Sequence, residues 1–210
     1  MKKYYRGVMY CIGLVILALG IILNTKTGLG VSPIISIPYC ISKIWKLNLG
    51  DITMYTYILY VVLQMVLRRR KFRSFDLLQI PMSIIFTRVI NVFNDKIIIN
   101  NSSFVMNLIL LMIAIMLTAI GVVITVEMKF VPNAADGLAQ AMAEAMNKNL
   151  GLAKNILDIF SVIITIGIGM FAGGKIIGIG LGTVLAVIGV GRAISLFNML
   201  FKNKLVAIAS

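Results

Sequence analysis

The sequence predicts an all-α, polytopic membrane helix bundle of two inverted three-span repeats, each with a short re-entrant or interfacial helix. The first observation is composition, since 60% of the 210 residues are hydrophobic and the mean hydropathy is +1.01. A soluble domain is rarely more than about half apolar. The second observation is a loose internal repeat, and the third is the placement of basic residues beside the apolar segments.

The repeat relates residues that lie 101 positions apart. Gly20 falls on Gly121, and Asn48-Leu49-Gly50 falls on Asn149-Leu150-Gly151. With a shift of 104 rather than 101 positions, segment 87–94 matches segment 191–198, with Arg, Ile, Phe and Asn at the same spacing. We therefore divide the chain into a first repeat, 1–98, and a second repeat, 99–210. Many transporters are built from duplicated, inverted halves that form a central site between them.

Six apolar segments are long enough to cross a membrane as helices. They lie at about 7–25, 52–67, 77–94, 104–126, 154–174 and 176–201. No removable signal peptide is expected, because no charged and short apolar start ends in a small-residue cleavage site. Two shorter segments, 33–45 and 133–147, follow the first span of each half and are too short to cross comfortably.

The distribution of Lys and Arg decides between six and eight spans. If both short segments cross, the basic residues are nearly balanced between the two sides. If neither crosses, 13 lie inside and 5 outside, with Lys154 counted inside and the intramembrane Arg88 and Arg192 left out. The positive-inside rule favours six spans. Three spans per half then invert the second half, and both termini of this multi-pass protein are predicted on the cytoplasmic side of the plasma membrane.

The formal charge of +13 does not indicate nucleic-acid binding, because the basic residues flank apolar spans. The densest group is expected to bind anionic lipid headgroups. It consists of Arg68, Arg69, Arg70, Lys71 and Arg73. With no histidine and only two cysteines in apolar segments, no metal site or cofactor is predicted. No paired carboxylates or nucleophile–base arrangement indicates an enzyme.

The N-terminal ends of both short segments are candidates for a substrate site. Their C-terminal ends are polar, so the N-terminal ends are predicted to lie deeper, where unpaired N–H groups suit an anion. The candidate residues are Gly28, Gly30, Ser32 and Pro33 in the first repeat, and Pro132 and Asn133 in the second. The alternative is that both segments are amphipathic helices on the membrane surface.

Four charged residues complete the candidate site. Arg88 and Arg192 lie within predicted spans, where a charge is costly and indicates function; the alternative is that they snorkel to the membrane surface. Asp158 is either the partner of Arg192 or a first-turn acid at a helix N-terminus. Asp136 is either a coupling acid or part of a helix cap after Asn133.

Two glycine-containing motifs resemble a known family. Gly28-Leu29-Gly30-Val31-Ser32-Pro33 follows the first span, and Gly178-Ile179-Gly180-Leu181-Gly182-Thr183 lies near the last. With the motifs in this order and a duplicated unit of roughly 80–100 residues, the chain resembles the YczE/YyaS/YitT family of bacterial membrane proteins. It is more similar to the YczE-like branch, because it lacks the C-terminal soluble domain of the YitT branch. The resemblance implies a polytopic protein of the bacterial cytoplasmic membrane. Helix packing is the favoured interpretation of the later glycines, over substrate contact.

Secondary transport of a small, anionic solute is the function that these features favour. The alternatives are a substrate-binding membrane subunit of a multi-component importer and an accessory or scaffold protein that transports nothing. The size of the chain fits a capture subunit, whereas an inverted repeat favours a transporter.

Overall fold

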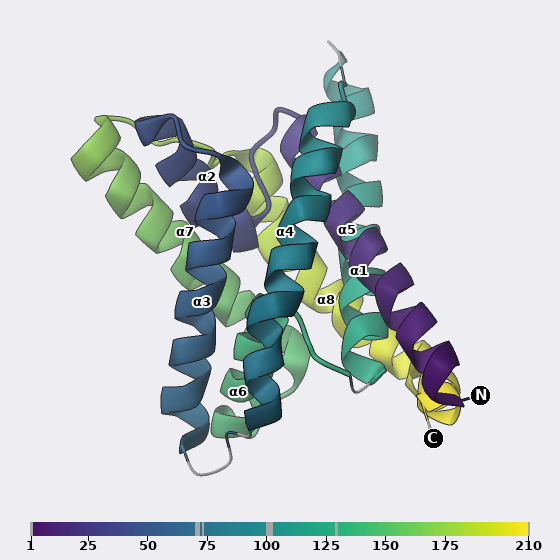
Figure 1. Ribbon diagram of the computed structural model, residues 1–210. Helices are drawn as coiled ribbons and strands as arrows, with labels where there is room; N and C mark the ends of the chain where they lie inside the picture. The colour runs from purple at the N-terminus through teal and green to yellow at the C-terminus, as the bar shows by residue number, and fades with distance from the viewer. Residues whose placement is uncertain (1, 70–71, 73, 100–102, 129, 210) are drawn as a thin grey trace.

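The computed structural model describes residues 2–69, 72, 74–99, 103–128 and 130–209, and every regular element in these ranges is helical (Figure 1). The first half contains α1 (Lys2–Lys26), α2 (Pro33–Trp45), α3 (Leu49–Arg68), the short 3₁₀ helix η2 (Ser74–Leu78) and α4 (Gln79–Lys96). The second half contains α5 (Phe104–Glu127), α6 (Ala134–Met146), α7 (Leu150–Gly173) and α8 (Leu181–Ala209).

Within these described ranges, six helices are long and apolar enough to cross a membrane, namely α1, α3, α4, α5, α7 and α8. This confirms the predicted polytopic bundle. Helix α1 begins at Lys2 rather than at 7, and the last two spans also depart from the predicted bounds. Helix α7 begins at Leu150 rather than at 154, and α8 begins at Leu181 rather than at 176, since Gly174 and Gly178 adopt positive φ and keep the intervening segment out of a helix.

The boundaries of the elements repeat with the shift of 101 positions. Helices α2 and α6 both have 13 residues, and each ends in a left-handed cap, Lys46 (φ 53°) in the first half and Asn147 (φ 53°) in the second. Asn48 and Asn149 then cap α3 and α7 by accepting a hydrogen bond from the backbone three residues later. The Asn-Leu-Gly match seen in the sequence therefore marks one turn used twice.

Equivalent helices run in opposite directions (Figure 1). Helices α1, α4 and α7 rise from the end of the bundle at which α1 begins and α8 ends, whereas α5, α8 and α3 return toward it. We name this end the terminal face and the other end the opposite face. Helix α2 lies toward the opposite face and α6 toward the terminal face.

Both short helices begin inside the bundle. The first residues of α2 and α6 are buried, whereas the residues that follow each helix, 46–48 and 147–149, are exposed. Each short helix also packs on the third helix of the other half, α2 on α7 and α6 on α3. This confirms that the N-terminal ends lie deeper, and it does not fit helices lying on the membrane surface.

Helices α1 and α5 form the closest contact between the halves, and two equivalent glycines make it possible. A Cβ at Gly20 would lie 2.6 Å from the backbone nitrogen of Thr118, and one at Gly121 would lie 2.6 Å from that of Leu17. Leu17 and Thr118 are themselves 101 positions apart. The contact is therefore reciprocal, and small residues at such crossings let helices approach closely in lipid.

The inverted arrangement predicts that Leu47 and Lys148, which are equivalent and exposed, label from opposite sides of the membrane. Single cysteines at these positions, in a background with Cys11 and Cys40 replaced, should react with a membrane-impermeant thiol reagent in intact cells at one position only. The other should react only after permeabilisation. Reaction of both from the same side would exclude the inverted topology.

Replacing Gly121 by Leu should lower the stability of the purified protein by about 1–3 kcal/mol, because the side chain has no room against α1. The measurement is the temperature at which the detergent-solubilised protein loses its monodisperse elution peak. Gly167→Leu is the matched control, since a Cβ at Gly167 meets nothing within 4 Å. Equal losses for the two variants would contradict the proposed role of the close contact.

Candidate functional site

Three charged side chains lie buried together where α6 begins and α7 passes. Asp136, in the first turn of α6, is 3% exposed, and Lys154 and Asp158 on α7 are 3% and 1% exposed. The Lys154 ammonium donates a hydrogen bond to Oδ1 of Asp158 one turn later, and both interact electrostatically with Asp136. Two carboxylates thus share one ammonium in the interior, where charge is expensive.

Three tyrosines surround these charges. Tyr10 on α1 and Tyr57 on α3 interact electrostatically with Asp136, and Tyr60 on α3 interacts with Asp158. All three rings are at least 96% buried. We call this set the central polar cluster; its members are Tyr10, Tyr57, Tyr60, Asp136, Lys154 and Asp158.

Several polar atoms of the central polar cluster have no hydrogen-bond partner within the described ranges. They are the three tyrosine hydroxyls and the Oδ2 atoms of both aspartates. Tyr57 lies beside Asn133 and Tyr60 beside Ser161, yet neither hydroxyl completes a hydrogen bond. Buried polar atoms are rarely left unpaired, and such atoms mark strain, chemistry or a bound ion or water.

The predicted pairing of Asp158 with Arg192 is replaced by the pair with Lys154. Because α7 begins four residues earlier than predicted, Lys154 lies inside the helix one turn before Asp158, rather than in a loop. Arg192 is exposed on α8, and no ion pair to it is present among the described residues.

Asp136 does not cap α6. The side chain of Asn133 accepts a hydrogen bond from the backbone of Ala135 at 3.4 Å, whereas within the described ranges Asp136 makes no hydrogen bond to the helix N-terminus. Asp136 nevertheless lies in the first turn of α6, where its charge offsets the helix dipole, and its role as a coupling acid stays a prediction. Pro132 directly precedes this cap and is partly buried.

Arg88 lies away from the central polar cluster. Its side chain is 65% exposed and forms a 3.5 Å ion pair with Asp51, in the first turn of α3. Such an exposed pair contributes little to stability. The structure thus supports the snorkelling interpretation of Arg88.

The two glycine motifs pack on each other, next to the start of α2. The Val31 N–H donates to the Gly178 carbonyl at 2.8 Å, and the Gly182 N–H donates to the Leu29 carbonyl at 2.7 Å. Gly30 has φ of +126°, and a Cβ there would lie 2.5 Å from the Thr183 hydroxyl. The segment from Gly28 to Pro33 therefore uses its backbone to join α8 to α2, which agrees with a packing role for the later glycines.

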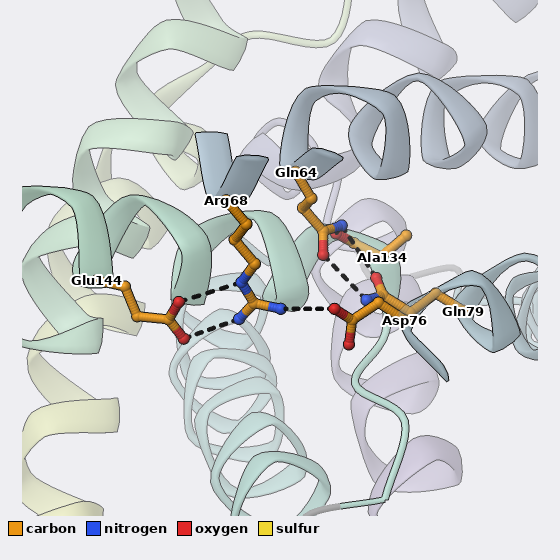
Figure 2. Close-up of polar contacts among 6 residues, drawn as sticks. All are labelled: Gln64, Arg68, Asp76, Gln79, Ala134 and Glu144. Carbon is orange, nitrogen blue, oxygen red and sulfur yellow. Dashed lines mark hydrogen bonds and ion pairs between the residues drawn. The ribbon is translucent and has the colours of Figure 1, made fainter. Parts of the chain in front are cut away.

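Polar contacts at the terminal face join α3 to α6, to η2 and to the start of α4 (Figure 2). Arg68 binds both carboxylate oxygens of Glu144, at 3.1 and 2.8 Å, and reaches Asp76 at 3.4 Å. Gln64 and Gln79 exchange two hydrogen bonds of 3.0 Å, and Gln64 also donates to the carbonyl of Ala134. We call these contacts the terminal clamp.

The terminal clamp changes the expectation for the basic cluster. Arg68 is 12% exposed and bound by protein carboxylates, so it is not free for the predicted headgroup contact. Arg69 is exposed, as expected for headgroup binding. Arg70, Lys71 and Arg73 lie outside the described residues.

Residues 4–199 match the model of a family of unknown function, DUF6198. The chain belongs to this family. No curated protein and no solved structure matches the chain. The resemblance to the YczE/YyaS/YitT family stays a prediction.

Removing the Lys154 charge should destabilise the protein strongly, since it leaves two buried carboxylates without a cation. Lys154→Met is expected to cost about 3–5 kcal/mol, whereas Lys154→Met with Asp158→Leu should cost less because the pair is removed together. Thermal unfolding of the detergent-solubilised variants measures both. A double variant as unstable as the single one would show that the pairing contributes nothing.

Proposed function

We propose that this protein is a secondary transporter in which the central polar cluster binds and releases a proton or another small cation during transport of a solute. The observation that carries the proposal is Asp136, an acid 3% exposed whose Oδ2 atom has no partner in the described part of the chain. Ionisable residues at membrane depth are functional by default, and acids there form proton relays in pumps and transporters.

The charge of the cluster argues for a cation rather than the anion expected from helix N-termini. Two carboxylates face one ammonium, and Asp136 in the first turn of α6 offsets the positive end of that helix. Just before α2, the Val31 N–H is already bound to the Gly178 carbonyl of the second glycine motif. Within the described central polar cluster, the one cation is Lys154, which is already paired with Asp158. No further cation is therefore available there to bind an anion.

The inverted architecture supports alternating access. Both short helices begin in the interior and end at opposite faces, so rocking of one half against the other would open each face in turn. At the terminal face, the terminal clamp joins α3 to α6 through an Arg–carboxylate ion pair. At the opposite face Lys43, which is equivalent to Glu144, lies 5.4 Å from the Tyr39 ring of its own helix. The two faces are therefore held by different contacts.

Loss of the Asp136 charge should abolish cation binding. The probe is a step in proton concentration, and separately in Na⁺ concentration, applied to proteoliposomes on a solid-supported membrane. We expect a transient charge movement for the wild type with one of these cations, its loss in Asp136→Asn, and its retention in Arg192→Gln. An unchanged signal in Asp136→Asn, or no signal from the wild type with either cation, would overturn the proposal.

A further inference from the structure

A cavity of about 480 Å³ opens where α5 ends, at the terminal face. It lies between the end of α5, the C-terminal half of α6, the start of α7 and α8. Its polar lining residues are Glu127, Gln140, Glu144, Asn149, Ser195 and Asn198. The volume falls in the range of small-molecule sites, and the central polar cluster contributes no residue to this lining.

Glu127 lies at a position where the local electrostatic field disfavours its negative charge. It is the last residue of α5, where the helix dipole disfavours a negative charge. Its side chain is largely buried, since the residue is only 8% exposed, yet it lines the cavity. Across the described ranges, no hydrogen bond or ion pair to its carboxylate is present. The carboxylate oxygens of Glu127 are not among the buried unpaired atoms, so they face the cavity, where they are available to a ligand of opposite charge.

The equivalent cavity at the opposite face shows that this acid is not demanded by the fold. That cavity, of about 420 Å³, is lined by Lys43 and Asn48, the equivalents of Glu144 and Asn149. The equivalent of Glu127 is Lys26, which suits a helix C-terminus and donates to the Asn94 carbonyl at 2.6 Å. The same architecture thus carries basic residues at one end and acidic residues at the other.

We propose that the cavity at the terminal face binds a small organic cation through a primary ammonium group, with Glu127 as its counterion. The amide oxygens of Gln140 and Asn149 can accept the remaining ammonium hydrogens; the Asn149 oxygen also accepts a hydrogen bond from the Leu152 N–H. The described residues contain no group of three acidic, cysteine or histidine side chains that could hold a metal ion. Glu144 is already neutralised by Arg68.

That this cation is the transported solute rests on the proposed function, whereas its binding does not. The first test is equilibrium binding to the detergent-solubilised protein, with putrescine as the probe and succinate as an anion of similar length. Putrescine should bind the wild type, and Glu127→Gln should weaken binding at least tenfold, equivalent to about 1.4 kcal/mol. Asp95→Asn, which removes an exposed acid at the end of α4, should leave binding unchanged.

Equal putrescine binding by Glu127→Gln and the wild type, or binding of succinate alone, would overturn the inference. A second measurement leaves Glu127 in place, in case that variant fails to fold. A cysteine at Ser195, which lines the cavity, should react more slowly with a thiol reagent when putrescine is present and not when succinate is present. Absence of this protection would also overturn the inference.

Different experimental outcomes would contradict the proposed transport function and the proposed cation cavity. Charge movement lost in Asp136→Asn but kept in Glu127→Gln, together with failed putrescine binding, would leave the central polar cluster standing and remove the cation cavity. Putrescine binding that depends on Glu127, without any charge movement in proteoliposomes, would leave a cation-binding membrane protein that does not transport by the proposed mechanism.

Discussion

The rest of the structure depends on the close crossing of α1 and α5. Gly20 and Gly121 allow each backbone to approach the other at equivalent positions, so the two halves are held antiparallel. In lipid, such contacts replace the hydrophobic driving force that is absent between apolar helices. Once this crossing is fixed, α2 comes to lie on α7 and α6 on α3, and the N-terminal ends of both short helices are buried.

Among the described residues, the buried charged side chains belong to the second half. The two halves therefore differ chemically, although their helices are arranged alike. The positions equivalent to Asp136, Lys154 and Asp158 are Ile35, Thr53 and Tyr57. Ile35 is an apolar core residue, Tyr57 contributes its hydroxyl to the central polar cluster, and the Thr53 hydroxyl donates to the carbonyl of Leu49 in its own helix. The first half thus contributes only tyrosines to the central polar cluster, whereas the second half contributes all of its charged groups.

Much of the fold was predictable because membrane helices reveal themselves by length, apolar content and flanking charge. The short helices, their buried N-termini and the repeat of Asn-Leu-Gly all follow from local sequence. The central polar cluster was only partly predictable. Asp136 and Asp158 stood out as acids in apolar segments, but Lys154 lies near a helix start and reads as a loop charge. Tyr10 and Tyr57 read as ordinary apolar residues, and only tertiary packing brings them to the carboxylates.

The exchange of short helices between the halves bears on how the protein is made. Helix α2 leaves the ribosome more than a hundred residues before α7, the helix of the other half on which it packs. Until then, α2 is an apolar segment too short to span and without its main support. Insertion of the first half must therefore end in an incomplete state, and the buried end of α2 becomes fixed only when synthesis is nearly finished. The duplicated halves are not independent folding units, although each has its own three spans.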